Sequence, residues 1–186
     1  MIKKFNKYLS YKNNSLYLDE TSFESIKKKY STPLYCYSLS EIYDNFFELK
    51  KSFTKIKPMI CYAVKANNHN QILSLLSKSG CGADVVSKGE LKKSIDNGIS
   101  ADKIVFSGVG KTKDEIKYAL NKKIKQLNVE SEEELEEIVE IAKVAKKKVN
   151  ICIRVNPDVD PRTHYKISTG RSEDKFGIPN SRVIKL

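Results

Sequence analysis

The sequence predicts an α/β fold whose strands form one parallel β-sheet. From residue 59 onward, short apolar runs alternate with amphipathic segments. Gly80 and Gly98 follow two of those segments. Helices commonly end with a residue in the left-handed backbone conformation, which glycine adopts easily. Strands and helices that alternate with short connections require a parallel sheet with right-handed crossovers, which forms either a barrel or an open doubly wound sheet. The periodicity leaves both architectures open.

Local patterns define the individual elements. The capping box Ser131-x-x-Glu134 opens one predicted helix, since each side chain can accept a hydrogen bond from a free backbone N–H group. In chain order we expect irregular structure over 15–20, helix 21–30, strand 34–37, a helix capped by Ser38 or Ser40 and continuing to about 52, strand 59–65, helix 71–79, strand 83–86, helix 89–97, strand 103–106, helix 113–121, strand 126–129, helix 131–146 and strand 149–155.

One apolar run, residues 59–64, ends at Lys65 and is followed by the turn-forming residues Asn67 and Asn68. Such a run is typical of a strand that is covered on both faces of a parallel sheet. The carboxyl ends of these strands are where α/β folds place their chemistry. Lys65 therefore either marks the exit of the strand into solvent, which spacing alone favours, or is a partly desolvated amine that can attack an aldehyde.

The composition predicts a soluble globular protein, because 40% of the residues are hydrophobic and 31% are charged. No apolar run reaches the roughly 18 residues of a membrane helix, and residues 1–10 lack an apolar core followed by a cleavage site. The cysteines have neither a Cys-x-x-Cys pair nor metal-ligand spacing, so we expect reduced thiols in a cytoplasmic protein and no metal site. They are Cys36, Cys61, Cys81 and Cys152.

A formal net charge of +11 raises the question of nucleic-acid binding. The lysine clusters at 27–29 and 146–148 fall at predicted helix ends, where cations complement the helix dipole. The sequence contains neither an arginine-rich arm nor interleaved aromatic residues. We therefore expect a solvated lysine-rich face and no nucleic-acid partner.

The tripeptide Gly110-Lys111-Thr112 follows a predicted strand and resembles the end of a phosphate-binding loop. The complete pattern requires a glycine five positions before Gly110, and Val105 stands there, inside the predicted strand. The loop is therefore too short to wrap a phosphate, and we do not expect nucleotide binding.

Arg154 directly follows the apolar residues 151–153. A buried guanidinium needs charged or hydrogen-bonding partners, so packing explains an arginine at this position poorly. We expect it to face a polar site at the end of a strand.

Several blocks together resemble a known family. Residues 62–67, Tyr-Ala-Val-Lys-Ala-Asn, resemble the pyridoxal-phosphate lysine motif of the alanine-racemase-like group that includes ornithine, arginine and diaminopimelate decarboxylases. Residues 82–91 resemble the next block of that group, and the spacing Gly-x-x-Lys111-x-x-x-Glu115 resembles a further loop. His164-x-x-Ile-x-Thr-Gly, followed by Lys-Phe-Gly at 175–177, resembles the diaminopimelate decarboxylases in particular.

The resemblance implies a (β/α)8 barrel of the TIM type, incomplete here because 186 residues fall short of the roughly 250 that a whole barrel takes. Residues 1–38 would be an N-terminal segment that packs with a C-terminal β domain lying outside this sequence. Residues 39–186 would be about the first half of the pyridoxal-phosphate-binding barrel, and we expect them to be inactive alone.

The resemblance also implies a chemistry. Lys65 would hold pyridoxal 5′-phosphate as an imine and act as the catalytic residue, with Asp84, Arg154 and His164 as further cofactor-binding residues. The whole protein would be a homodimer that converts meso-2,6-diaminopimelate to L-lysine and carbon dioxide in lysine biosynthesis. The alternatives are a decarboxylase acting on ornithine, arginine or carboxynorspermidine, and a non-enzymatic barrel that binds the cofactor.

Overall fold

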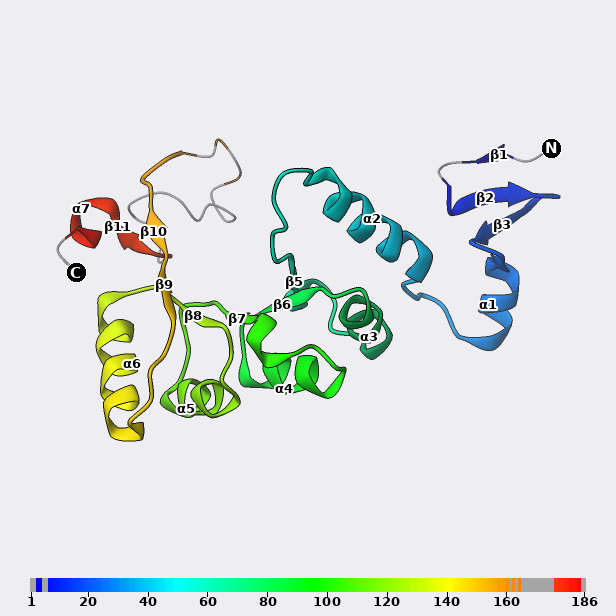
Figure 1. The fold of residues 1–186 in the computed structure, drawn as a ribbon. Coiled ribbons are helices and arrows are strands. Elements are labelled where there is room, and N and C mark those ends of the chain that lie inside the picture. The colour runs from blue at the N-terminus through cyan, green and yellow to red at the C-terminus, as the bar shows by residue number, and fades with distance from the viewer. Residues whose placement is uncertain (1–2, 5–6, 161, 163, 165–175, 185–186) are drawn as a thin grey trace. The chain divides into compact units, whose positions relative to one another are not determined.

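The computed structural model describes residues 3–4, 7–160, 162, 164 and 176–184 of the chain (Figure 1). Its internal contacts divide the chain into two units, Met1–Pro58 and Met59–Leu186. In this described part, no helix combines the length and apolar character needed to cross a membrane.

The first unit contains a four-stranded antiparallel meander in the order β1-β2-β3-β4. Its elements are β1 (Lys3–Lys4), β2 (Leu9–Lys12), β3 (Ser15–Leu18), β4 (Thr21–Ser22), α1 (Phe23–Lys29) and α2 (Leu39–Ser52). Asn13 and Asn14 join β2 to β3 with φ angles of 47° and 66°, the left-handed conformations that a tight hairpin turn requires. The prediction of irregular structure over 15–20 is therefore wrong, and the adjacent asparagines are the signal that it overlooked.

Residues 34–37, predicted as a strand, are irregular in the structure. The exposure alternates as in a strand, with Tyr35 and Tyr37 outward and Leu34 and Cys36 half-buried. In the described residues, however, no neighbouring strand pairs with this segment, and an extended segment without a partner leaves its backbone groups to water. Ser38 begins α2, because its Oγ accepts the N–H of Glu41 at 3.0 Å.

The second unit is built on five parallel strands in the order β5-β6-β7-β8-β9. The strands are β5 (Cys61–Ala63), β6 (Gly82–Val85), β7 (Ile104–Phe106), β8 (Gln126–Val129) and β9 (Ile151–Ile153), and the helices between them are α3 (Asn70–Lys78), α4 (Lys88–Asp96), α5 (Lys113–Lys122) and α6 (Glu132–Ala145). Short 3-10 turns, η1 (Val64–Ala66) and η2 (Ala101–Lys103), follow β5 and precede β7.

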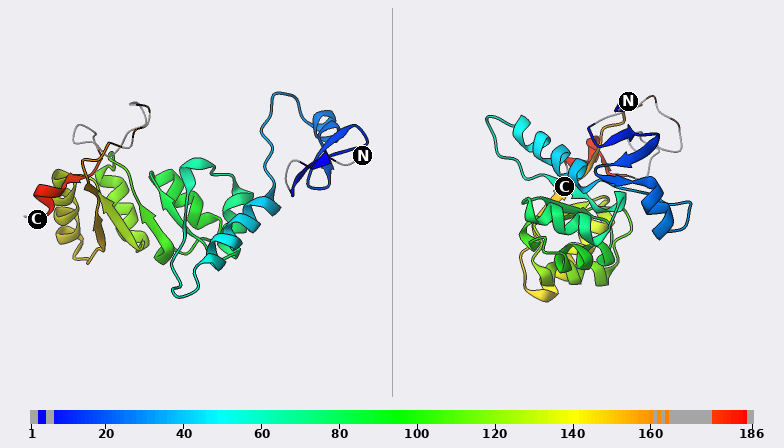
Figure 2. Two further views of the ribbon diagram at one scale, coloured as in Figure 1. Left: turned by 90° about the horizontal axis from the view of Figure 1, so that it is seen from above. Right: turned by 90° about the vertical axis from the view of Figure 1, so that its right-hand side faces the viewer.

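This strand order decides between the two predicted architectures. A doubly wound sheet reverses its strand order and carries helices on both faces. Here each strand pairs with the next one along the chain, and α4, α5 and α6 lie on the same side of the sheet (Figures 1 and 2). The sheet is therefore part of a (β/α)8 barrel, as predicted.

Two short strands and a helix close the described chain. They are β10 (Val155–Asn156), β11 (Ile178–Pro179) and α7 (Asn180–Val183). β10 and β11 pair in parallel, with Val155 opposite Ile178. The predicted strand 149–155 is thus divided in the structure, because β9 pairs with β8 whereas β10 pairs with β11.

The two faces of the five-stranded sheet differ in polarity. Strand residues that alternate along β6, β7 and β8 point toward the helices and are fully buried: Ala83, Val85, Ile104, Phe106, Leu127 and Val129. They pack against helix residues such as Leu91, Ile116 and Ile138. The intervening positions lie on the opposite side, which we call the inner face, and include Asp84, Gln126 and Asn128. Because successive side chains of a strand alternate, the apolar face toward the helices fixes which residues line the inner face.

The backbone of β6 approaches β7 closely at Gly82. A Cβ atom on this residue would collide with the carbonyl oxygen of Lys103 and lie 2.9 Å from the Cys61 Sγ atom. Gly89, in the first turn of α4, has only the Ser87 Oγ atom near its missing Cβ, at 3.7 Å. The two glycines therefore form a matched pair.

We predict that Gly82→Ala lowers the free energy of unfolding by about 1–3 kcal/mol, because a backbone carbonyl cannot move aside as a flexible side chain could. Gly89→Ala should leave it unchanged or raise it by up to about 1 kcal/mol, since alanine is the better helix former. Urea unfolding followed by circular dichroism measures both. Equal effects of the two substitutions would contradict the close approach at Gly82.

Candidate active site

Lys65 lies in the connection that follows β5. The strand ends at Ala63, and in the turn η1 Val64 is fully buried while Lys65 is exposed. The strand thus ends two residues earlier than predicted. Lys65 is at the carboxyl edge of the sheet and open to solvent, which is the alternative that spacing alone favoured, and it is not partly desolvated. The reason is that β5 is an edge strand of the described sheet, so the turn after it has a strand neighbour on one side only.

Side-chain hydrogen bonds fix the backbone around Lys65. The Tyr62 hydroxyl donates to the carbonyl oxygen of Asn67 at 3.1 Å, and Asn67 Oδ1 accepts the N–H of His69 at 3.0 Å. His69 in turn caps α3, because its Nδ1 accepts the N–H of Gln71 at 3.3 Å. The exposed amine is thus carried by a short connection that is anchored before and after it.

A row of polar side chains crosses the inner face. The Ser107 hydroxyl donates to Asp84 Oδ1 at 2.6 Å and accepts from Asn128 Nδ2 at 2.9 Å. Asn128 Oδ1 accepts from Gln126 Nε2 at 2.8 Å. These residues belong to β6, to the residue after β7 and to β8, so the row links three neighbouring strands. Each member uses a neighbour on the same face as its hydrogen-bond partner.

Asp84 in β6 is paired with Ala63 in β5. Ala63 precedes Lys65 by two residues in the chain. In the described part of the chain, no hydrogen bond or ion pair joins Asp84 to Lys65. Burial, and then the negative charge of Asp84, raise the pKa of the Cys61 thiol. The Asp84 carboxylate therefore influences the groups at the β5 side of the inner face.

Arg154 follows β9 and is held from two sides. Its Nη1 lies 3.2 Å from Oε2 of Glu130, whose side chain is only 2% exposed, and Glu130 also accepts the N–H of Gly108 at 3.0 Å. The Phe176 ring lies 4.8 Å from the guanidinium carbon, within cation–π range. Gly177 has a φ of 80°, and a Cβ on it would lie 2.9 Å from the carbonyl oxygen of Arg154. Despite these contacts, 39% of the Arg154 side chain is exposed.

Lys111 is buried next to this pair. Its Nζ donates to the carbonyl oxygens of Gly108 and Asn128, both at 2.7 Å, and to Oε1 of Glu134 at 2.6 Å. Glu134 also accepts the N–H of Glu130 through Oε2 at 2.8 Å. From the sequence we assigned Glu134 to helix capping alone and gave Lys111 no partner. A lysine and a glutamate that follow successive strands were the available signal, but spacing could not show that the two side chains meet.

Carboxylates in the first turns of α4 and α5 hold the loops before these helices. Glu90 accepts the N–H of Val86 at 2.9 Å. Glu115 accepts the N–H groups of Lys88 at 2.8 Å and Thr112 at 3.0 Å, and the second bond completes a capping box. Burial tends to raise the pKa of Glu115, but these hydrogen bonds, with one from the Thr112 hydroxyl, outweigh it and lower the pKa.

His164 is exposed and lies outside the helices and strands. The remainder of its sequence block, residues 165–175, lies outside the described residues. The structure therefore describes Phe176 and Gly177 from that block, and it brings these two residues to Arg154.

The arrangement offers two cations at one edge of the sheet. Lys65 and Arg154 follow the two outermost of the five strands, which places about 19 Å of sheet between them along the edge. The structure thus pairs Arg154 with Glu130, and among the described residues no hydrogen bond or ion pair joins Arg154 to Lys65. A ligand that engages both cations must span part of the inner face and carry a group that reacts with an amine and a group that accepts hydrogen bonds.

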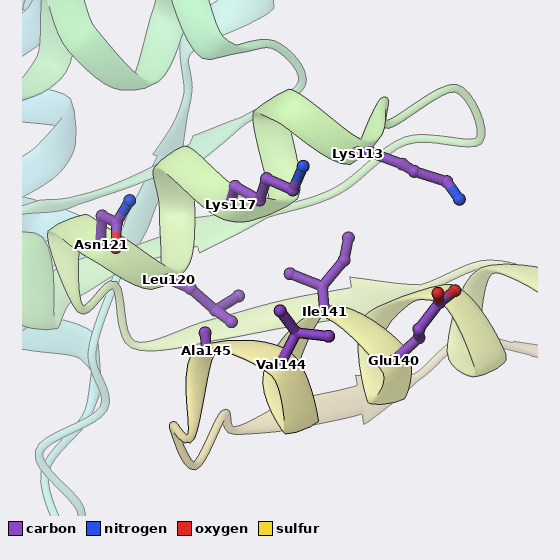
Figure 3. A pocket seen from close by; sticks show the side chains of 8 residues that line it. All are labelled: Lys113, Lys117, Leu120, Asn121, Glu140, Ile141, Val144 and Ala145. Carbon is purple, nitrogen blue, oxygen red and sulfur yellow. The ribbon is translucent and has the colours of Figure 1, made fainter.

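A groove of about 490 Å³ lies between α5 and α6 (Figure 3). Leu120, Ile141 and Val144 point into it, while Lys113 and Glu140 stand at its rim. Its lining comes from the outer helices and not from the strand ends, where α/β folds hold their reactive groups. We therefore place the candidate site at the strand ends.

Comparison with known families gives one clear match. Residues 39–185 match the family described as pyridoxal-dependent decarboxylase, pyridoxal binding domain. The chain is 43% identical over 178 residues to a diaminopimelate decarboxylase of Aquifex aeolicus, and the match covers 96% of this chain and 42% of the relative. The chain therefore spans about two fifths of the length of the curated relatives it matches.

Solved structures agree with this comparison. The chain is similar to the diaminopimelate decarboxylase of Helicobacter pylori crystallised with L-lysine, with a TM-score of 0.84, 44% identity, and coverage of 88% of this chain and 41% of that chain. The arginine decarboxylase of Paramecium bursaria Chlorella virus aligns with a TM-score of 0.71 and 23% identity, covering 87% of this chain and 41% of that chain. At that identity the second likeness concerns the fold alone.

The lowered pKa of Glu115 predicts a pH-dependent contribution to stability. The contribution is complete above the unfolded-state pKa of about 4.3 and is lost as the pH falls through the lower folded-state value. We expect Glu115→Gln to cost about 1 kcal/mol at pH 7, the usual scale of a helix cap, and less below about pH 4. Urea unfolding at pH 7, 5, 4 and 3 measures the difference.

Glu136→Gln is the matched control, because it removes the same charge from an exposed position of α6. A Glu115→Gln effect that stays constant over the whole pH range would show that the carboxylate charge does not matter to the cap.

Proposed function

This chain belongs to the pyridoxal-dependent decarboxylases, whose pyridoxal binding domain it matches over residues 39–185, and from that premise we propose that the protein is a diaminopimelate decarboxylase. It would release one carboxylate of meso-2,6-diaminopimelate as carbon dioxide and yield L-lysine. The observation that carries the proposal is Lys65, an exposed amine anchored at the carboxyl edge of the sheet in a chain 43% identical to such an enzyme.

Pyridoxal phosphate is the cofactor of this family, and the residues of the chain fit it. The cofactor needs an amine to hold its aldehyde, and Lys65 is exposed on a fixed turn. It also carries oxygens that accept hydrogen bonds, and 39% of the Arg154 side chain is exposed while its guanidinium group is paired with Glu130. When bound, the cofactor supplies an electron-accepting ring for the electron pair left by the departing carboxylate.

The residues of this chain would divide the work. Lys65 would hold the cofactor through its amine. Asp84 carries negative charge at the β5 side of the inner face and favours the protonated form of an amine placed there. Arg154 would donate to the phenolic oxygen of the cofactor, and His164 would contribute to the same pocket. Glu130 keeps the Arg154 charge in place and has no direct contact with the cofactor in this proposal.

The sister enzymes are the second candidates. Decarboxylases of ornithine, arginine or carboxynorspermidine share the cofactor chemistry, and a non-enzymatic barrel would share the lysine. The identity of 43–44% to diaminopimelate decarboxylases, against 23% to an arginine decarboxylase, favours the first assignment. Carbon dioxide release from each of these amino acids in turn distinguishes the candidates.

The organisation of the whole protein is also part of the proposal. Residues 1–38 would pack with a C-terminal β domain, and residues 39–186 would contribute about the first half of the barrel. The protein would act in lysine biosynthesis as a cytoplasmic homodimer with a small amino-acid substrate, without nucleic-acid or membrane partners.

We predict that Lys65 carries the cofactor. Borohydride reduction of the native holoprotein followed by peptide mass spectrometry should place the pyridoxyl group on Lys65, and Lys65→Ala should abolish both the adduct and turnover. Lys88 and Lys111 are the internal controls, because each follows a strand of the same sheet. Lys88 is exposed, whereas Lys111 is buried. An adduct on either of them would contradict the assignment.

We also predict that residues 1–186, produced by themselves, release no carbon dioxide from meso-diaminopimelate. Both outer strands of the described sheet, β5 and β9, then have unpaired edges, which favours association over a closed site. The measurement is carbon dioxide release with added pyridoxal phosphate, with Lys65→Ala as the control. Turnover that depends on Lys65 would show that this part of the chain suffices.

A further inference from the structure

We propose that Lys111 and Glu134 are positioning residues that hold Arg154 in its cofactor-binding orientation through Glu130. The inference rests on the proposed function, because it concerns how Arg154 is presented to pyridoxal phosphate. It adds two residues to which the sequence gave no role in cofactor binding.

Lys111 joins three segments that approach the carboxyl edge of the sheet. Its acceptors are the carbonyl of Gly108 in the loop after β7, the carbonyl of Asn128 in β8 and the carboxylate of Glu134 in α6, at 2.6–2.7 Å. The Lys111 side chain is 1% exposed. An ammonium group has three protons to donate, and here each has an acceptor. All three Lys111 donors are therefore used by acceptors of the protein, and none is available to a phosphate group.

Glu134 connects Lys111 to the backbone of Glu130. One carboxylate oxygen of Glu134 accepts from Lys111 and the other accepts the backbone N–H of Glu130 at 2.8 Å. Glu134 therefore sets the backbone position from which the Glu130 side chain extends. The predicted capping box is only half formed, because Ser131 Oγ accepts the N–H of Glu134, but the Glu134 carboxylate accepts the N–H of Glu130 and not that of the cap residue Ser131.

Gly108 links Lys111 to Glu130 without passing through Glu134. Its carbonyl accepts from Lys111 at 2.7 Å, and its N–H donates to the Glu130 side chain at 3.0 Å. Its φ of 104° is a backbone conformation that residues other than glycine rarely adopt. Lys111 thus fixes Glu130 by two routes, one through Glu134 and one through Gly108.

The charges of the four side chains balance. Lys111 and Glu134 form one pair and Arg154 and Glu130 form the other, with three of the four side chains at most 11% exposed. Removal of the Lys111 charge would leave two carboxylates beside one guanidinium. The Glu134 carboxylate would then be buried without its cation, which is costly. We expect Arg154 to move toward Glu134 and away from the ligand, because this movement would pair the uncompensated charge.

The test is a double-mutant cycle for pyridoxal phosphate binding in the native full-length protein. Lys111→Met keeps the length and apolar contacts of the side chain and removes its charge, and Glu134→Gln keeps its size and removes its charge. Each is combined with Arg154→Ala. The dissociation constant of pyridoxal phosphate, measured by fluorescence titration, is the readout, with kcat as a second one.

We expect Lys111→Met and Glu134→Gln each to weaken pyridoxal phosphate binding about tenfold when Arg154 is present, and less than about threefold when it is alanine. Such non-additivity arises only if the two residues act through Arg154. If Lys111→Met fails to fold, the Glu134→Gln cycle decides the question. Lys113→Met is the matched control, because this nearby lysine is exposed and its Nζ is 3.5 Å from a Glu137 carboxylate oxygen, away from the four-residue cluster.

Losses that are equal with and without Arg154, or no loss at all, would overturn the inference while leaving the proposed function intact. A wild-type protein that does not bind pyridoxal phosphate would instead overturn the proposed function, and this inference with it.

Discussion

The alternation of side chains along the parallel strands is the constraint on which the rest of the structure depends. Because Val85, Phe106 and Val129 are buried against the helices, their strand neighbours must point to the opposite face. That face consequently collects Asp84 and Asn128, and the residues just beyond the strands extend the same pattern to its edge. Burial of one face thus selects, without any further interaction, which side chains can meet a ligand on the other.

Polar groups on a partly enclosed face are costly unless they have partners, and the structure supplies these partners locally. Ser107 connects Asp84 to Asn128, and Glu130 connects Arg154 to the Gly108 backbone. Among the described residues, the one fully buried side-chain polar atom without a hydrogen bond is Ser94 Oγ, which belongs to α4. The polar side chains that line the inner face are therefore held by partners within the chain itself.

The sequence predicted the regular part of the fold and less of the site. Strand 126–129 has the predicted bounds, and each of the four helices α3, α4, α5 and α6 begins and ends within one residue of its predicted bounds, because their periodicity is sustained and their caps are explicit. The hairpin around Asn13 was missed because its strands are four residues long, and residues 34–37 have a strand pattern but no described partner. The pairing of Lys111 with Glu134 could not be predicted, since it joins the loop after β7 to the first turn of α6, and these segments meet only once the sheet has formed.

The hydrogen bonds within the polar network also indicate which side chains are still available to bind a ligand. Asp84 and Glu130 already accept hydrogen bonds from protein groups, and Lys111 donates all three of its own. Within the described chain, Lys65 takes part in no hydrogen bond or ion pair, and 39% of the Arg154 side chain stays exposed despite its contact with Glu130. A ligand with an aldehyde and acceptor oxygens would therefore find its two strongest partners in these cations. In the arrangement that we propose, Arg154 binds such a ligand only while Glu130 stays fixed, so the buried pair of Lys111 and Glu134 supports ligand binding.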